Sequence, residues 1–134
     1  MTIRPCDKSD IEELLKLAID CYPKFDVESS RLWLTKNIEN PDVFVAIGKY
    51  CAGLAFIAKP FYQPSKANFE LEFVCSRKTR FGAIESLNLV RFFNDLRRSK
   101  GYDRMWVNSR LADLEPLILR LGGKVGGKSW ILEG

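Results

Sequence analysis

Apolar and acidic side chains alternate from Phe69 to Phe73 within one stretch of the sequence, residues 69–74. A period of two predicts a β-strand whose two faces carry different side chains. The apolar face holds Phe69, Leu71 and Phe73, and the acidic face holds Glu70 and Glu72. This strand is the first place to look for chemistry, because it puts two carboxyl groups side by side on one face.

Shorter apolar runs predict the other strands. Residues 43–47 and 52–58 form a hairpin that turns at Gly48 and Lys49. Residues 2–5, 105–107 and 129–132 are the remaining short strands, and Pro5 suits the edge of a sheet.

Helical spacing of apolar residues marks the segments between the strands. The first helix has one stripe, formed by Ile11, Leu14, Leu15, Ala18 and Tyr22. We expect Asp7 or Ser9 to cap this helix and Pro23 to end it. A second helix follows Asp26 and runs to residue 38.

The longest predicted helix covers residues 82–101. Its apolar positions fill more than one stripe, so we expect most of its surface to be buried; they are Ile84, Leu87, Leu89, Val90, Phe92, Phe93 and Leu96. A last helix starts near residue 113 and ends at Gly122 and Gly123. The order β-α-α-β-β-β-α-β-α-β predicts an α/β fold, with a mixed central sheet and helices on both faces.

Length and composition limit the kind of protein. A chain of 134 residues with 46% hydrophobic and 28% charged residues predicts a single folded domain, residues 1–134. The net charge of +4 favours an anionic partner without selecting CoA, nucleic acid or phospholipid. No apolar run suits a secretory signal or a membrane span, so we expect a cytoplasmic protein with reduced cysteines and no membrane partner.

The sequence has no histidine. This excludes Ser-His-Asp and Cys-His catalysis and most catalytic zinc sites, and we expect no metal. Acid–base chemistry then falls to Glu, Asp, Tyr, Cys, Lys or water. Cys75 could be a nucleophile, but without an obvious activator a core thiol is the favoured interpretation.

Two segments match a known signature. Residues 74–84, VCSRKTRFGAI, resemble the strand–loop–helix signature V-x-P-x-x-[QR]-x-x-G-x-[GA] of the GNAT N-acetyltransferase superfamily. Residues 117–123, LILRLGG, look like its L-Y-E-K-L-G-F segment. The order of elements extends the resemblance over nearly the whole chain. It differs at Thr79, where the family has Gln or Arg, at Ile84, where it has Gly or Ala, and at Ile118, which replaces the tyrosine that commonly protonates the leaving thiolate.

The resemblance implies a GNAT-like (acyl-CoA N-acyltransferase) fold, with acetyl-CoA as co-substrate and an amine as acceptor. In the family, the backbone at Phe73, Val74 and Cys75 would hold the acyl-pantetheine. The pyrophosphate would lie on the loop and helix start, here Thr79, Arg80, Phe81, Gly82, Ala83 and Ile84. Independently of the family, a helix N-terminus after a strand presents free N–H groups and partial positive charge to phosphates. Arg77 and Lys78 would add charge, although the same loop could be an ordinary solvated turn.

Many GNAT enzymes place the general base on the strand that carries Glu70 and Glu72. Glu72 is the candidate, because it lies closer to the expected acyl group; the alternative is that both carboxylates simply face solvent. Residues 22–26 and 59–66 are loops that could touch an acceptor.

Two functions remain open at this stage. The chain is either an acetyl-CoA-dependent N-acetyltransferase or a catalytically inactive GNAT-fold protein with a structural or binding role. Under the second alternative, the chain could be a bacteriophage virion component, because it resembles small GNAT-like phage proteins that have lost motif residues. It could also bind a protein partner or form a homodimer paired through residues 129–132. A nucleic-acid partner is disfavoured, because Asp95 and Asp103 interrupt the basic stripe near the end of the long helix.

Overall fold

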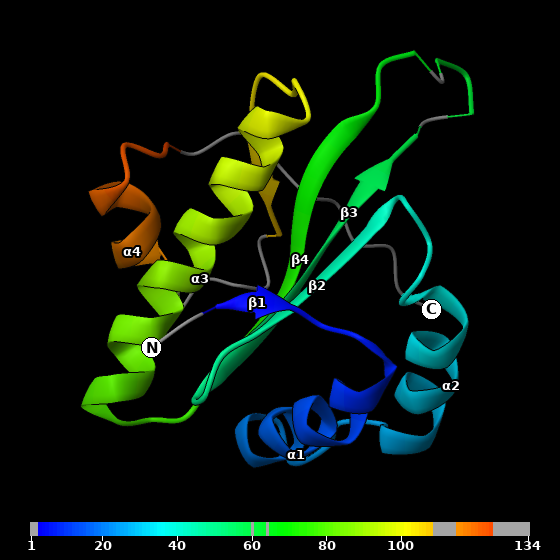
Figure 1. Ribbon diagram of the computed structural model, residues 1–134. Helices are drawn as coiled ribbons and strands as arrows, with labels where there is room; N and C mark the ends of the chain where they lie inside the picture. The colour runs from blue at the N-terminus through cyan, green and yellow to red at the C-terminus, as the bar shows by residue number, and fades with distance from the viewer. Residues whose placement is uncertain (1–2, 60, 64, 109–114, 125–134) are drawn as a thin grey trace, which may run out of the picture.

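The computed structural model describes residues 3–59, 61–63, 65–108 and 115–124. The elements of this part of the chain (Figure 1) are, in order, β1 (Arg4–Pro5), a 3-10 turn (Lys8–Asp10), α1 (Ile11–Cys21), α2 (Val27–Asn37), β2 (Val43–Ile47), β3 (Cys51–Ala58), β4 (Asn68–Ser76), α3 (Arg80–Ser99), β5 (Met105–Val107) and α4 (Glu115–Arg120). The predicted order is confirmed from β1 to α4. The predicted strand over residues 129–132 and the predicted helix start at 113 lie outside the described residues.

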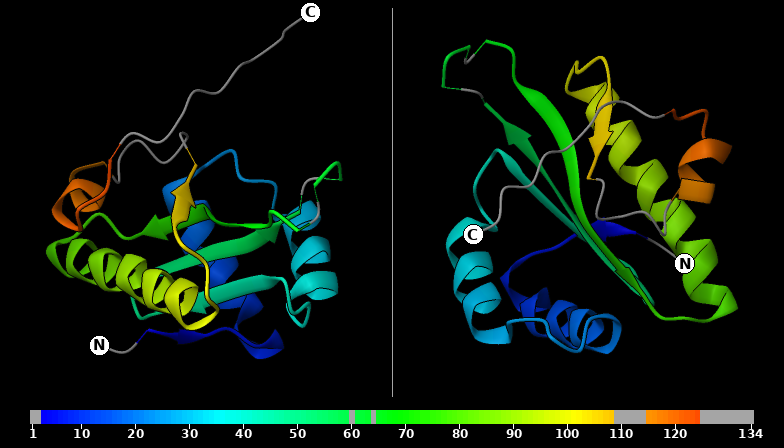
Figure 2. Two further views of the ribbon diagram at one scale, coloured as in Figure 1. Left: turned by 90° about the horizontal axis from the view of Figure 1, so that it is seen from above. Right: turned by 180° about the vertical axis from the view of Figure 1, so that it is seen from behind.

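The strands form one mixed sheet in the order β1-β2-β3-β4-β5. Neighbouring strands from β1 to β4 are antiparallel, and β5 lies parallel to β4. A parallel pair needs a crossover, which α3 provides. Figure 2 shows α1 and α2 on one face of the sheet and α3 on the other, with α4 beside α3. The predicted α/β class, with helices on both faces, is confirmed.

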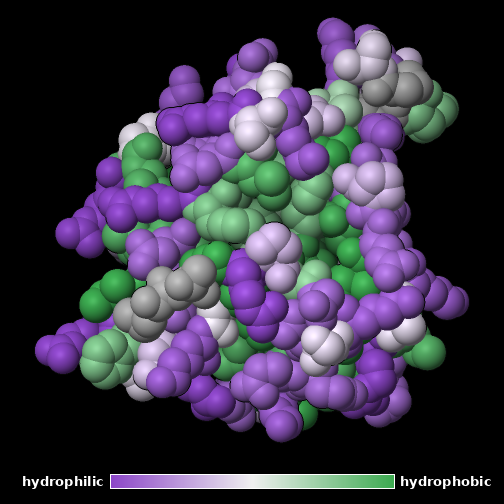
Figure 3. Space-filling view, viewed as in Figure 1, coloured by the Kyte–Doolittle hydropathy of each residue, from purple (hydrophilic) through white to green (hydrophobic). Residues whose placement is uncertain are grey.

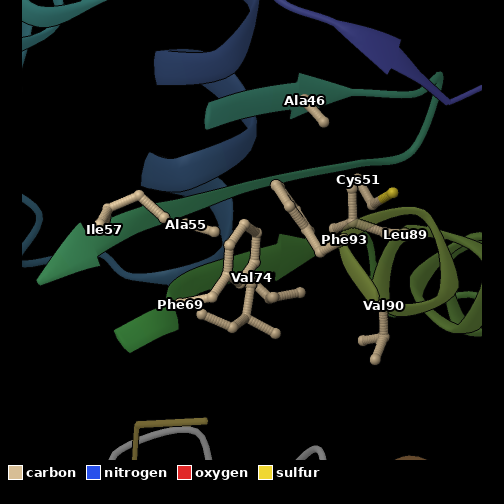
Figure 4. Close-up of a cluster of buried hydrophobic side chains, with 10 residues drawn as sticks. Ala46, Cys51, Ala55, Ile57, Phe69, Val74, Leu89, Val90 and Phe93 are labelled. Atoms are coloured by element: carbon tan, nitrogen blue, oxygen red, sulfur yellow. The ribbon is translucent and has the colours of Figure 1, made fainter. Parts of the chain in front are cut away.

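Each face of the sheet has its own hydrophobic core. Under α3, the side chains of Phe69, Leu89 and Phe93 are fully buried against the strands (Figure 4). Under α1 and α2, the core is formed by residues such as Leu17 and Leu34. On the surface seen in Figure 3, apolar residues gather over the middle of the molecule and hydrophilic side chains surround them.

Helix α3 is less buried than its sequence suggests. Its buried positions lie on one stripe that includes Leu89, Val90 and Phe93, whereas Ile84 is 47% exposed. The expectation that most of the helix surface is buried is therefore wrong at Ile84, because only the sheet side of the first turns is covered.

The start of α1 is fixed by a local network of hydrogen bonds. Asp7 caps the 3-10 turn by accepting the N–H of Ser9, whereas the N-cap of α1 itself is Asp10. The prediction that Asp7 or Ser9 caps α1 is therefore wrong, because a 3-10 turn precedes the helix. Asp10 lies at the junction with α1 and accepts from both guanidinium nitrogens of Arg4, at 2.7 and 2.6 Å. This pair ties β1 to α1, and it holds the pKa of Asp10 at about 2, well below its ordinary value.

One carboxyl group lies inside the core under α3. The side chain of Glu85 is fully buried, and its Oε1 accepts the N–H of Tyr50 at 2.5 Å, at the turn between β2 and β3. Burial, together with hydrogen bonding to Glu85, raises the pKa of the neighbouring Cys51 thiol. This contact holds the start of α3 against the hairpin.

Candidate active site at the end of β4

Strand β4 extends beyond β5 at one end of the sheet. Phe69, Glu70 and Leu71 pair with residues 105–107 of β5, and the N–H of Asn108 then donates to the Leu71 carbonyl at 3.1 Å. Residues 72–76 of β4 pair with β3 on one side only, and no described strand pairs with their other edge. This unpaired edge is where an extended ligand can lie against backbone N–H and C=O groups.

The pairing of β3 with β4 contains a β-bulge at Glu72. Ala55 pairs with Leu71 and Leu54 pairs with Phe73, so Glu72 is the extra residue of β4. A bulge breaks the alternation of faces, and both Glu72 and Phe73 therefore point toward α1 and α2. The prediction that Phe73 shares a face with Phe69 and Leu71 is wrong for this reason: Phe73 packs with the core under α1, and the other two pack under α3.

A cavity of about 330 Å³ lies beside this bulge, between the sheet and helices α1 and α2. Of the nine described residues that line it, Glu72 and Ser30 are polar, and the other seven are aromatic or aliphatic: Leu14, Phe25, Trp33, Leu34, Leu54, Phe56 and Phe73. Two rings from the α1–α2 connection, Tyr22 and Phe25, pack on Phe73 with centroids 5.6 and 5.9 Å away. The predicted acceptor loop, residues 22–26, thus contributes to the cavity.

The Glu72 carboxylate is half-buried and held in place. Its Oε2 accepts from Nδ2 of Asn108, the residue that follows β5, at 2.8 Å. Glu70 lies on the same face but does not line the cavity, and burial together with the nearby Glu72 charge raises the pKa of Glu70. Of the two carboxylates proposed from the sequence, Glu72 is the one that the structure places in a cavity.

The unpaired edge of β4 exposes the backbone of Val74 and Ser76. The N–H of Arg77 donates to Tyr50 on the β3 side, and alternate residues of a strand face the same neighbour, so Val74 and Ser76 face away from β3. The Tyr22 hydroxyl donates to the Val74 carbonyl at 3.2 Å, and the Cys21 thiol donates to the Ser76 carbonyl at 2.9 Å. Within the described residues, the two N–H groups on this edge have no acceptor. The backbone N–H groups on this edge can therefore donate to a ligand, whereas both carbonyls already accept a hydrogen bond from a side chain of the protein.

Helix α3 begins two residues earlier than predicted, at Arg80. Thr79 is its N-cap, and its hydroxyl accepts the N–H of Gly82 at 3.1 Å. A Cβ atom at residue 82 would overlap the backbone carbonyl of Arg77, so the glycine is needed for the fold of this loop itself. The N–H groups of Arg80 and Phe81 have no acceptor among the described residues, which leaves two amides of the helix start available to an anion.

The side chains around this helix start are mostly exposed. The Phe81 ring stacks on Tyr50, with centroids 5.8 Å apart, and the Arg80 guanidinium lies 5.3 Å from the Phe81 ring centre. Arg77 forms an ion pair with Asp20 at 2.9 Å. Ala83 is also exposed, in the same turn. The charged groups near the two free amides are thus Lys78 and Arg80, because Arg77 is engaged with α1.

Cys75 is buried in the core, and Ile118 is partly buried. The Cys75 thiol is buried, and burial raises its pKa to about 12, which fits a core thiol and not a nucleophile. Ile118 packs on α4 against the core under α3, at the position where the GNAT pattern has tyrosine. Helix α4 ends as predicted, with Gly122 at φ +83° and the N–H of Gly123 donating to the Ile118 carbonyl.

Sequence reasoning missed one functional candidate, Asn108, and recognised Tyr22 only as part of a helical stripe and of a loop that could touch an acceptor. Asn108 donates a hydrogen bond to Glu72. The sequence signal for Asn108 was its position directly after the short predicted strand 105–107, which the structure places parallel to β4. Tyr22 was assigned to the buried stripe of α1, whereas it lies just after the helix and is 42% exposed. Pro23 was the signal, because the residue before a proline tends to leave helical geometry.

The described residues contain no group of three His, Cys, Asp or Glu side chains arranged to hold a metal ion. None of the described helices is both long and apolar enough to cross a membrane.

No protein-family model matches the sequence, and no curated protein sequence matches it significantly. Solved structures do match the fold. An aminoglycoside antibiotic 6'-N-acetyltransferase from Acinetobacter haemolyticus has a TM-score of 0.82 at 11% identity, with 100% of this chain and 98% of that chain covered. An aminoglycoside N-acetyltransferase in complex with CoA has a TM-score of 0.74 at 14% identity, with 99% and 93% covered. A ribosomal-protein-alanine N-acetyltransferase from Brucella melitensis has a TM-score of 0.76 at 8% identity, with both chains fully covered.

Each of these likenesses covers 99% or more of this chain. The chain has the fold of the GNAT acetyltransferases, as its sequence predicts.

Proposed function

We propose that this protein is an N-acetyltransferase that transfers the acetyl group of acetyl-CoA to an amine. The observation that carries the proposal is the end of β4, where a held carboxylate in a cavity lies next to an unpaired strand edge. A second support is that solved structures of the same fold include acetyltransferases, one of them in complex with CoA.

The cofactor would lie along the edge of β4 and end at the start of α3. The segment proposed to hold its pantetheine arm is Phe73, Val74 and Cys75, and within it the N–H of Val74 lies on the edge that β5 leaves open and would donate to the arm. Its pyrophosphate would lie against residues 79–84 and accept from the amides of Arg80 and Phe81, where the helix dipole and the charge of Lys78 stabilise an anion.

Glu72 is the proposed general base. The amine lone pair would attack the thioester carbonyl, the C–N bond would form and the C–S bond would break. The proton lost by the amine would pass to Glu72, directly or through a water, and the departing thiolate would take a proton from solvent, since Ile118 has none to give. Holding the two reactants together supplies much of the rate acceleration.

A second candidate is a GNAT-fold protein that binds without turnover. It is favoured by Ile118 in place of tyrosine, and by Tyr22 and Cys21, which already donate to the carbonyls of the open edge. A virion or cytoplasmic location, a protein partner and a homodimer all stay predictions from the sequence.

Calorimetric titration with acetyl-CoA and with CoA tests the first proposal. We expect micromolar affinity, about −8 kcal/mol, and transfer of radiolabelled acetyl groups to an amine panel. Arg80→Pro removes one free amide at a helix position that tolerates proline, and extended Thr79, at φ −133° and ψ 167°, suits the preceding residue.

Arg80→Ala is the matched control, because it removes the same charge and keeps the amide. Arg80→Pro should weaken CoA binding clearly more than Arg80→Ala. Absence of any heat at millimolar acetyl-CoA and CoA would refute the proposal and favour the second candidate.

A further inference from the structure

We propose that the cavity beside Glu72 binds a primary amine carried on a single aromatic or branched aliphatic group, and that this amine is the acetyl acceptor. That the amine is the acetyl acceptor rests on the proposed function, whereas amine binding itself is argued from the cavity alone. Its volume, its lining and its one charged group each restrict the ligand.

The volume suits one ring and a short chain. A closed cavity of about 150 Å³ is known to take up a benzene molecule, and this cavity has about 330 Å³. Four of the lining side chains are aromatic, namely Phe25, Trp33, Phe56 and Phe73, and they can contact a ring by its face or its edge. A ligand of one ring plus a two- or three-atom chain therefore fills the space.

The charge of the site selects a cation. Of the described residues that line the cavity, Glu72 is the ionisable one, and its carboxylate accepts a hydrogen bond from Asn108 at 2.8 Å. An ammonium ion beside a held carboxylate in apolar surroundings is stabilised more than it would be in water. The same carboxylate is the proposed base, so an amine bound here has its nitrogen next to the group that would deprotonate it.

The apolar lining rejects a heavily hydroxylated amine. Among the described residues that line the cavity, the polar groups besides the Glu72 carboxylate are the Ser30 hydroxyl and the Trp33 indole N–H, so the hydroxyl groups of an amino sugar would be buried with few partners. This differs from the aminoglycosides on which two of the structural neighbours act. The fold is shared, and the lining of this cavity sets the acceptor class.

The aromatic side chain of Trp33 lines the cavity and is partly exposed to solvent. Trp33 is 43% exposed, and Leu32, the preceding residue of α2, is 64% exposed without lining the cavity. A bound ring would remove water from Trp33 and not from Leu32. The two neighbours on α2 thus form a natural pair of test and control positions.

Calorimetry or ligand-observed NMR on the full chain, without any CoA, tests the site with three probes. We expect 2-phenylethylamine to bind at least tenfold more tightly than 2-phenylethanol, which lacks the charge, and than glucosamine, which lacks the apolar group. Glu72→Gln and Trp33→Ala should each weaken 2-phenylethylamine at least fivefold, while Glu70→Gln and Leu32→Ala change it less than twofold.

The outcomes separate this inference from the proposed function. Equal binding of the amine and the alcohol, tighter binding of glucosamine, or equal effects of Glu70→Gln and Glu72→Gln would overturn the inference. Tight amine binding by a protein that fails to bind acetyl-CoA would support the amine site and refute the transferase. Efficient acetyl transfer to glucosamine, with none to 2-phenylethylamine, would support the transferase and refute the inference.

Discussion

On the face of β4 toward α1 and α2, the Glu72 carboxylate lies in a cavity of about 330 Å³ and is held by one amide. On the neighbouring edge of the same strand, the carbonyls of Val74 and Ser76 already accept hydrogen bonds from Tyr22 and Cys21. The first region combines a carboxylate with a mostly apolar cavity, and the second uses part of its backbone hydrogen-bonding capacity within the chain.

This difference agrees with where the sequence departs from the GNAT pattern. Thr79, Ile84 and Ile118 all belong to the segments expected to bind CoA or to protonate its thiolate, and none lies on the cavity side. The sequence thus departs from the GNAT pattern on the proposed cofactor side and not among the described residues that line the proposed acceptor cavity. The following predictions test that contrast, from the largest expected effect to the smallest.

Glu72→Gln should have the largest effect, on catalysis. A general base contributes about 10²- to 10⁴-fold to a rate, so kcat/KM for acetyl transfer should fall by at least about 10²-fold. Glu70→Gln, on the same face of β4 but outside the cavity, should stay within about twofold of the unaltered protein. Equal losses in the two variants would mean that the bulge does not single out Glu72.

Gly82→Val should have the next largest effect, on stability. The added Cβ would overlap the Arg77 carbonyl, so we expect the free energy of unfolding in urea to fall by about 2–3 kcal/mol. Ala83→Val is the control, because residue 83 is exposed in the same turn and should lose less than about 0.7 kcal/mol. Similar losses in both would show that the loop before α3 relaxes easily, and that the cofactor side is more adaptable than the contrast suggests.

Most of the fold is predictable from the sequence, because period-two and helical patterns survive in the structure. The alternation over residues 69–74 gives β4, and the Gly48 turn gives the β2–β3 hairpin. The resemblance at 74–84 correctly places a strand end, a loop and the start of α3, although the helix begins at Arg80 and not at Gly82.

The site is less predictable, because it depends on contacts between segments distant in sequence. The bulge at Glu72 depends on how β4 pairs with β3. The alternation over residues 69–74 alone therefore predicts the wrong face for Phe73. Asn108 reaches Glu72 only because β5 lies parallel to β4. The cavity is lined by residues of α1, α2, β3 and β4, so no local sequence pattern predicts it.

Lowering the pH should loosen the α1 side of the molecule through Asp10. Its pKa is about 2 beside Arg4, below the value of about 3.9 in an unfolded chain. The resulting stabilisation is fully present above pH 4 and is lost as the pH falls toward 2. In urea unfolding at pH 4, 3 and 2, Asp10→Asn should show a shallower loss of stability than the unaltered protein. Parallel slopes would mean that the Arg4 pair adds nothing to the folding of α1.

Tyr22→Phe should have the smallest effect, and it tests the cofactor side directly. The substitution removes the hydroxyl that donates to the Val74 carbonyl at 3.2 Å, and it keeps the ring on Phe73. A net hydrogen bond is worth about 0.5–1.5 kcal/mol, so freeing this acceptor for the pantetheine should raise CoA affinity by about two- to tenfold in a calorimetric titration. Tyr62→Phe, in an exposed loop, should change nothing. If Tyr22→Phe instead weakens CoA binding, the hydroxyl contributes to the cofactor site, and the two sides of β4 are more alike than their hydrogen bonds suggest.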